Sequence, residues 1–236
     1  MIKILISGSN GIIGHELINV LKKKYYVVAI DNQTIGSANL NAKKFYKCPK
    51  GYTKEFIKFI EKIHNTVDLM FFYVDEELLN ISRNLKNKKI LNKIIISDRN
   101  TIELCDNKNK LNHYLSKYIN IPKLNNKKSI IKPIHGRGSK NIITTNSKKI
   151  INFFKKDKTY ITQEFIDGNE YTVDCLFNKQ NNLIFSLARR RIVASNISLI
   201  NKIEKNKTLH NLCKKISKHI KFYGPVNFQF IIDKKT

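Results

Sequence analysis

Short apolar runs alternate with amphipathic stretches along the first hundred residues of the chain. The apolar runs have the length of buried parallel strands and lie at residues 2–7, 25–31, 67–74 and 93–97. The amphipathic stretches repeat apolar side chains at helical spacing and lie at residues 15–25, 53–64 and 75–86. This order predicts a strand–helix–strand opening with a right-handed crossover, inside a doubly wound α/β domain.

The pattern changes after residue 97. Residues 98–122 are expected to form a helical segment that ends at Pro122. Further strands are expected at residues 129–132, 160–165, 171–177, 183–194 and 226–233. Amphipathic helices are expected at residues 148–156 and 206–220. The second half of the chain is therefore predicted to be of the α+β type.

The stretch SIIKPIHGRGSK, residues 129–140, carries the first candidate chemistry. Lys132 ends an apolar strand, and a loop with Gly136 and Gly138 follows Pro133. A fixed cation beside a loop whose backbone N–H groups can approach an anion closely is what binding a triphosphate requires. The same residues also occur in ordinary hairpin turns, and their spacing differs from that of a P-loop.

A second glycine-rich turn, with Gly8, Gly11 and Gly14, joins the first strand to the first helix, and Asp31 closes the next strand. This opening resembles extended short-chain dehydrogenases and epimerases, in which such a loop holds the pyrophosphate of NAD. Those enzymes need a Tyr-x-x-x-Lys pair, and no tyrosine beyond residue 50 has a lysine four positions later. The favoured alternative is that these glycines only form a tight turn.

Composition indicates a globular protein of 236 residues, 42% of them hydrophobic and 10% aromatic. The formal net charge of +26 would attract nucleic acid, but the lysines are scattered over every segment instead of forming one stripe, so nucleic-acid binding is not expected. The four cysteines lack zinc spacing and are expected to be reduced thiols of a cytoplasmic protein. No membrane-spanning run and no signal peptide are expected.

Motifs in the second half follow the order typical of the ATP-grasp superfamily, and the chain resembles members similar to the large chain of carbamoyl-phosphate synthase. The motifs are Asn107-Lys108 with Ile121-Pro122, Ile131-Lys132-Pro133 with residues 135–140, residues 162–174, residues 189–191, and residues 224–229. The resemblance implies a Rossmann-like pre-ATP-grasp domain at 1–98 and an incomplete ATP-grasp domain at 99–236. It divides the latter into a lid at about 120–162 and a C-lobe from about 163.

The resemblance also implies a nucleotide site. It assigns the phosphates to Lys108 and Lys132, with a cover formed by Gly136, Arg137, Gly138 and Ser139. It assigns the adenine edge to the backbone of a hinge formed by Gln163, Glu164, Phe165 and Ile166.

Three further residues receive roles from the same resemblance. Glu170 would accept the ribose hydroxyls, and its alternative is an exposed turn acid. Arg191 would contact substrate or phosphate as a catalytic residue, whereas the alternative places residues 189–191 at alternating exposed positions of a strand. Gln229 would bind Mg²⁺ or Mn²⁺ through a hard oxygen donor, or else form a hydrogen bond within the sheet.

The activity implied is transfer of the γ-phosphate of ATP to a carboxylate, bicarbonate or carbamate, followed by attack of an amine or another nucleophile on the acyl phosphate. The implied partners are ATP, a divalent cation and a small carboxylate substrate, and a homo-oligomer is left open. The acidic metal-ligand strand expected after Gln229 does not occur before Thr236, so the chain is expected to be the ATP-binding part of a longer ligase. The alternatives are a noncatalytic ATP-grasp relative and an NAD-binding protein.

Overall fold

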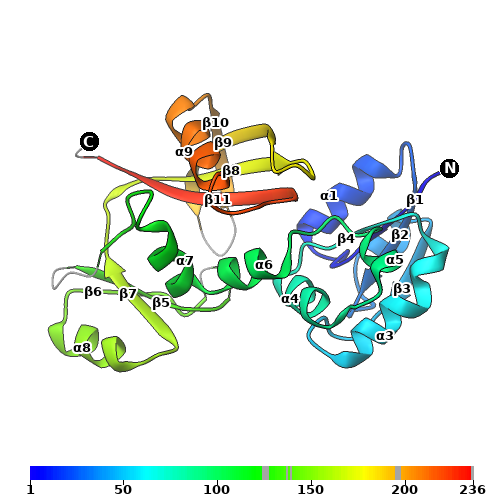
Figure 1. The fold of residues 1–236 in the computed structure, drawn as a ribbon, viewed down its shortest axis with the longest axis horizontal. Coiled ribbons are helices and arrows are strands. Elements are labelled where there is room, and N and C mark those ends of the chain that lie inside the picture. Colours follow the sequence, from blue (N-terminus) through cyan, green and yellow to red (C-terminus); the bar gives the residue numbers. More distant parts are fainter. Residues whose placement is uncertain (124–127, 137, 139, 195–197, 235–236) are drawn as a thin grey trace. The chain divides into compact units, whose positions relative to one another are not determined.

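The computed structural model describes residues 1–123, 128–136, 138, 140–194 and 198–234. The chain divides into two compact units, Met1–Ile102 and Glu103–Thr236 (Figure 1). Among the described residues, no helix is both long and apolar enough to cross a membrane.

The first unit is built on a parallel sheet of four strands in the order β3-β2-β1-β4. The strands are β1 (Lys3–Ile6), β2 (Tyr26–Asp31), β3 (Lys44–Lys47) and β4 (Leu69–Phe71). The helical segments are α1 (Ile12–Leu21), α2 (Ala38–Asn41), α3 (Lys54–Ile63), η1 (His64–Thr66), α4 (Asp75–Asn84) and α5 (Lys88–Leu91). Separate apolar clusters, one around Phe56 and one around Ile18, bury the strands. The predicted α/β opening is confirmed.

The expected strand at residues 93–97 is wrong. Only Ile94 pairs with β4, through an isolated bridge to Met70. Ile90 and Ile94 are both buried in the core beside β4, so the apolar run serves packing and does not extend the sheet. β3 was not expected, because it has only four residues, begins and ends with an exposed lysine, and contains no fully buried residue.

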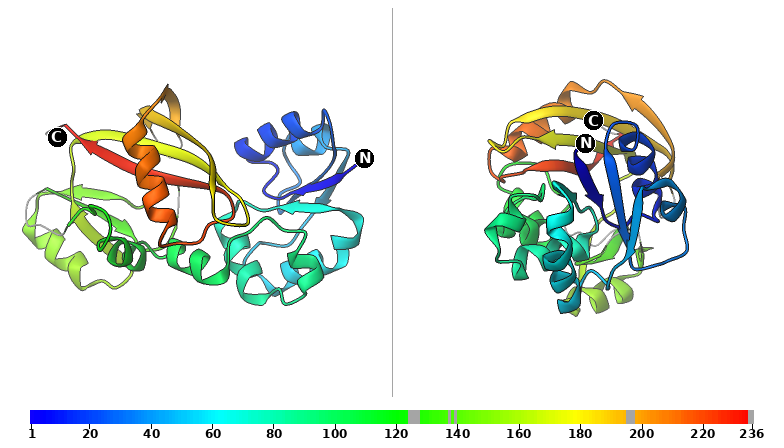
Figure 2. Two further views of the ribbon diagram at one scale, coloured as in Figure 1. Left: turned by 45° about the horizontal axis from the view of Figure 1, so that its top comes forward. Right: turned by 90° about the vertical axis from the view of Figure 1, so that its right-hand side faces the viewer.

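The second unit contains two antiparallel sheets, which Figure 2 shows from two further sides. The smaller sheet has the order β6-β5-β7, with β5 (Ser129–Pro133), β6 (Ile143–Thr145) and β7 (Tyr160–Glu164). The larger has the order β10-β9-β8-β11, with β8 (Gly168–Phe177), β9 (Leu183–Ala194), β10 (Ser198–Glu204) and β11 (Gly224–Asp233). The helices are α6 (Arg99–Asp106), α7 (Lys108–Leu115), α8 (Lys148–Lys156) and α9 (Lys207–Ser217). Of the strands, β6 and β10 were not expected.

The helical segment expected at residues 98–122 is two helices, not one. The helix is interrupted at Asn107. The side-chain oxygen of Asn107 accepts the backbone N–H of Lys110 at 2.9 Å and thereby caps α7. An asparagine at this position competes with helix continuation, because its short side chain satisfies a backbone donor that would otherwise be free.

The larger sheet has one apolar and one polar face. Tyr171 pairs with Arg190 of β9 and Phe230 of β11, and its side chain lies in the core that α9 covers. The neighbouring residue, Thr172, pairs with Arg189 and with Gln229. Because side chains alternate along a strand, the polar residues of β8 occupy the face opposite α9.

A glycine substitution tests the tight turn after β1. A methyl group added at Gly14 would lie 2.6 Å from the Cα atom of Ser9, whereas one added at Gly11 meets nothing closer than 3.3 Å. We expect Gly14→Ala to lower the free energy of unfolding by about 2 kcal/mol, since overpacking forces backbone shifts. Gly11→Ala, the matched control, should cost clearly less. Urea denaturation measures both, and equal losses would contradict this account of the turn.

Candidate functional site

Lys132 places a partly buried ammonium group on β5. Its neighbour Ile131 is fully buried, so alternation along the strand directs Lys132 to the other face of the small sheet. Burial lowers the pKa of Lys132, the nearby charge of Lys108 lowers it further, and Glu170 opposes both by raising it. Lys132, Lys108 and Glu170 therefore lie close enough to influence one another electrostatically.

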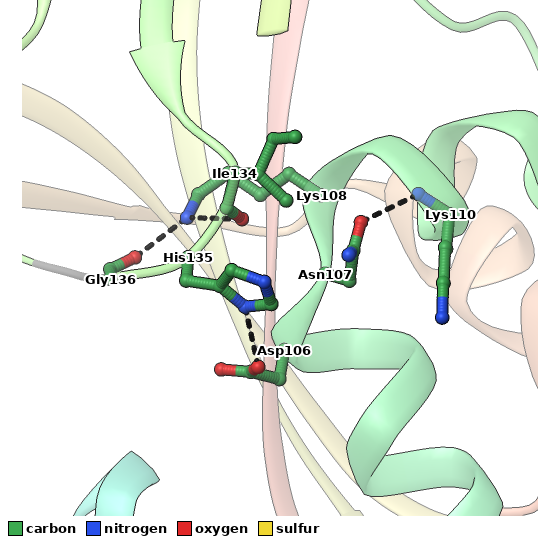
Figure 3. A network of polar contacts seen from close by, with 7 residues as sticks. All are labelled: Asp106, Asn107, Lys108, Lys110, Ile134, His135 and Gly136. Atoms are coloured by element: carbon green, nitrogen blue, oxygen red, sulfur yellow. Dashed lines mark hydrogen bonds and ion pairs between the residues drawn. The ribbon is translucent and has the colours of Figure 1, made fainter. Parts of the chain in front are cut away.

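Lys108 holds the base of the loop after β5. Its backbone N–H donates to the Ile134 carbonyl at 3.1 Å. Its ammonium donates to the Gly136 carbonyl at 2.6 Å and to the Ile134 carbonyl at 3.4 Å (Figure 3). His135, between those two carbonyls, pairs through Nδ1 with the Asp106 carboxylate at 2.6 Å. The start of α7 therefore contacts Ile134 and Gly136, and the end of α6 contacts His135 between them.

The loop needs its glycines. Gly136 and Gly138 have φ values of +102° and +69°, which L side chains rarely adopt. A methyl group added at Gly136 would meet nothing within 4 Å, so the space beside this residue is open. Arg137 and Ser139, expected to share in the cover, lie outside the described residues.

The expected hinge begins with the last two residues of β7, Gln163 and Glu164. The Gln163 side chain is buried and donates to the Pro122 carbonyl at 3.1 Å. The Glu164 N–H donates to the Lys123 carbonyl at 2.7 Å, and its carboxylate accepts the Lys123 N–H at 2.9 Å. These bonds fasten the end of β7 to the segment after α7.

The next two residues of the hinge differ in their backbone contacts. The Phe165 N–H donates to the Lys128 carbonyl at 2.9 Å, and the Lys128 ammonium lies 4.1 Å from the Phe165 ring centroid. The Ile166 N–H makes no hydrogen bond within the described part of the chain. Of the hinge donors at residues 164–166, the N–H of Ile166 is the one open to a ligand.

Glu170 and Arg191 form an ion pair on the polar face of the larger sheet. An Arg191 Nη1–H donates to a Glu170 carboxylate oxygen, and only 8% of the arginine side chain is exposed. Arg189, on the same face, pairs with Asp174 at 2.6 Å and is more exposed, at 27%. The Arg191 guanidinium thus holds a carboxylate that also interacts with Lys132.

Arg190 differs from its two neighbours. It points to the opposite face and pairs with Glu204 at 3.2 Å, and Glu204 also accepts the Tyr171 hydroxyl at 2.8 Å. The three arginines alternate along β9, as the alternative for residues 189–191 supposed, but each has an acidic partner.

Gln229 shares the polar face with Glu170 but is exposed. The carboxylates on this face, Glu170 and Asp174, are engaged by arginines. Among the described residues, no group of three His, Cys, Asp or Glu side chains could hold a metal ion. Gln229 therefore offers a single amide oxygen, whereas Mg²⁺ normally also takes one or two carboxylates from protein.

The glycine turn of the first unit is satisfied from within. Both Asp31 carboxylate oxygens accept backbone N–H groups, from Asn10 and Gln33, each at 2.9 Å. The Tyr73 hydroxyl donates to the Gly8 carbonyl at 2.5 Å. Both carboxylate oxygens of Asp31 thus help to hold the backbone of this turn in place.

A family model described as an ATP-grasp domain matches residues 105–234, more than half of the chain. The chain belongs to the ATP-grasp family. The match begins at the end of α6 and extends through β11, so the small sheet, the loop after β5 and the larger sheet all belong to the ATP-grasp domain.

Solved structures share the fold of this ATP-grasp protein. N5-carboxyaminoimidazole ribonucleotide synthetase from Thermotoga maritima has a TM-score of 0.69 at 17% identity, covering 100% of this chain and 66% of its own. The Staphylococcus aureus synthetase, complexed with ADP, has a TM-score of 0.74 at 16% identity, covering 99% and 67%. L-amino acid ligase from Bacillus licheniformis has a TM-score of 0.70 at 15% identity, covering 100% and 64%. The chain spans about two thirds of their length. No curated protein sequence matches it.

Sequence reasoning assigned no role to His135 or Asp106. They lie 29 positions apart, and only the break at Asn107 brings them together. A histidine beside the glycine loop was the available signal, but its partner could not be chosen among the chain's acidic residues.

Replacement of the arginines on the polar face tests their unequal burial. We expect Arg191→Met to lower the free energy of unfolding by about 1–2 kcal/mol, because it leaves the Glu170 carboxylate without its buried partner. Arg189→Met, which breaks a more exposed pair on the same strand, should cost less than about 1 kcal/mol. Urea denaturation of the two variants measures the difference. A larger loss for Arg189→Met would show that burial does not rank these pairs.

Proposed function

We propose that the chain is the ATP-binding part of an ATP-grasp ligase that activates a small carboxylate, or bicarbonate or carbamate, as an acyl phosphate. In this proposal residues 1–98 are the pre-ATP-grasp domain and 99–236 the ATP-grasp domain, with a lid at about 120–162 and the C-lobe from about 163. The observation that carries the proposal is the electrostatic interaction between Lys108 and Lys132, next to a glycine loop with open space beside Gly136. Two cations and free space favour a polyanionic ligand.

The proposed nucleotide runs from the glycine loop to the hinge. Lys108 and Lys132 bind the phosphates, and the unpaired N–H of Ile166 donates to the adenine edge. Glu170 accepts the ribose hydroxyls, in an orientation that Arg191 fixes. Arg191 is assigned to the site through this contact with Glu170. A structural relative complexed with ADP supports the choice of an adenine nucleotide.

The proposed chemistry transfers the terminal phosphoryl group of ATP to a carboxylate oxygen, with ADP as the leaving group. An amine or another nucleophile then attacks the acyl carbon and displaces inorganic phosphate. The charges of Lys108 and Lys132 offset the negative charge on the transferring group. A divalent cation would add to this charge stabilisation when bound, with Gln229 as one oxygen donor. Relatives named as an L-amino acid ligase and as a biotin carboxylase complexed with MgADP and bicarbonate support this reaction class.

Reduced cysteines also support a cytoplasmic protein. None of the four cysteines, all of which the structure describes, forms a disulfide bond, and Cys48, Cys175 and Cys213 are buried. Burial raises the pKa of Cys48 to about 12, so this thiol stays protonated.

Nucleotide binding by a lysine variant tests the proposal. We expect Lys132→Met to weaken binding of a nonhydrolysable ATP analogue by about 10- to 100-fold, because a buried cation that meets phosphate is lost. Lys149→Met, which removes an exposed lysine of α8, is the matched control and should bind as the wild type does. Isothermal titration calorimetry measures all three proteins. An absence of analogue binding by the wild type, or equal binding by Lys132→Met, would contradict the proposal.

The same variant should be more stable without nucleotide. Because the pKa of Lys132 is lowered in the folded state, the unfolded chain binds this proton more tightly. The free energy of unfolding should therefore rise as the pH increases through the window between the folded and unfolded pKa values, with the full burial cost present below it. Lys132→Met should remove this contribution and raise the melting temperature at neutral pH. A lower melting temperature than that of Lys149→Met would contradict the direction of the shift.

A further inference from the structure

The base of the glycine loop is tied to the helical segment by three contacts of different kinds. One is the backbone bond from Lys108 to the Ile134 carbonyl, and another is the ammonium contact of Lys108 with the Gly136 carbonyl. The third is the pair between His135 and Asp106 (Figure 3). The backbone bond and the His135–Asp106 pair use no atom that would bind a phosphate. The ammonium contact uses the group that the proposed function assigns to phosphate.

We propose that the His135–Asp106 pair is a latch that positions the glycine loop for the nucleotide phosphates. This inference rests on the proposed function for its ligand, but the tether itself is independent of it. When a phosphate oxygen displaces the Gly136 carbonyl from the Lys108 ammonium, Gly136 loses its contact with α7. The latch and the Lys108–Ile134 backbone bond then keep residues 134–136 beside α7. His135 is thus a positioning residue that acts through the loop.

The geometry favours a tether over a catalytic role. Nδ1 of His135 is engaged with Asp106, and 62% of the histidine side chain is exposed, against 21% for Asp106. An exposed pair stabilises a fold only weakly, so its main effect is on the local order of the residues that it joins. Holding three loop residues in place before binding lowers the ordering cost that a phosphate ligand would otherwise meet.

Amide hydrogen exchange on the full chain, without nucleotide, tests the tether. His135→Ala and Asp106→Ala should each speed exchange severalfold at Ile134 and Lys108, whose N–H groups donate to the Thr159 and Ile134 carbonyls, and the double variant should exchange no faster than either single variant. Asp106→Asn, which keeps an oxygen acceptor for the Nδ1–H, should retain most of the protection. His210→Ala is the matched control, because it removes a similar 2.6 Å contact, with Ser186, from α9. Unchanged exchange, or additive effects in the double variant, would overturn the latch.

Calorimetry with ADP and with adenosine tests whether the His135–Asp106 latch positions the loop for phosphates. Both alanine variants should bind ADP about three- to fivefold more weakly, as expected for loss of an exposed ion pair, and bind adenosine unchanged. An equal loss for both ligands would indicate a general disturbance of the fold and would overturn the positioning role. If the wild type binds neither ligand, the proposed function fails, while the exchange experiment still decides whether the tether exists.

Discussion

The central constraint on the second unit is the repulsion between two ammonium groups, those of Lys132 and Lys108, one of them partly buried. Bringing like charges together away from water costs free energy that the fold must offset. The structure offsets it with the Glu170 carboxylate and with the carbonyl oxygens of Ile134 and Gly136. Two positive charges thus face one carboxylate, which Arg191 also engages, so a polyanion would offset the remaining repulsion.

The two-faced sheet β10-β9-β8-β11 makes this arrangement possible. Its apolar face packs under α9, which leaves the other face for charged residues. A one-residue slip of β9 against β8 would turn Arg191 toward α9 and remove the partner of Glu170. The register between β8 and β9 is therefore fixed by burial on the face that α9 covers and by ion pairs on the opposite face. A conformationally defined carboxylate beside Lys132 is the result.

The elements with a strong apolar period were predictable from the sequence, and those without one were not. α8 and β9 have the expected bounds, because Ile151 anchors an amphipathic helix and β9 is a long run of strand formers and arginines. The strands that were missed, β3, β6 and β10, all lie at sheet edges. Edge strands are short and polar, and their pairing is decided by neighbours distant in the sequence.

For the candidate site, the ordered motifs indicated the cations at positions 108 and 132, because motif order is written in the chain. The groups that contact these cations cannot be read from the motif order. Gly136 and Ile134 contribute carbonyl oxygens, which every residue carries, and Arg191 was expected to contact a ligand although it holds Glu170. Backbone acceptors and partner choice depend on three-dimensional placement.

The break at Asn107 also determines which way two opposite charges face. In an uninterrupted α-helix, side chains two positions apart diverge by about 200° around the axis, so Asp106 and Lys108 would point away from each other. With one helix ending and another starting between them, Asp106 contacts His135 and Lys108 contacts Ile134 and Gly136, three consecutive residues after β5. The Asn107 cap thus lets one anionic side chain, Asp106, and one cationic side chain, Lys108, hold the same loop from two successive helices.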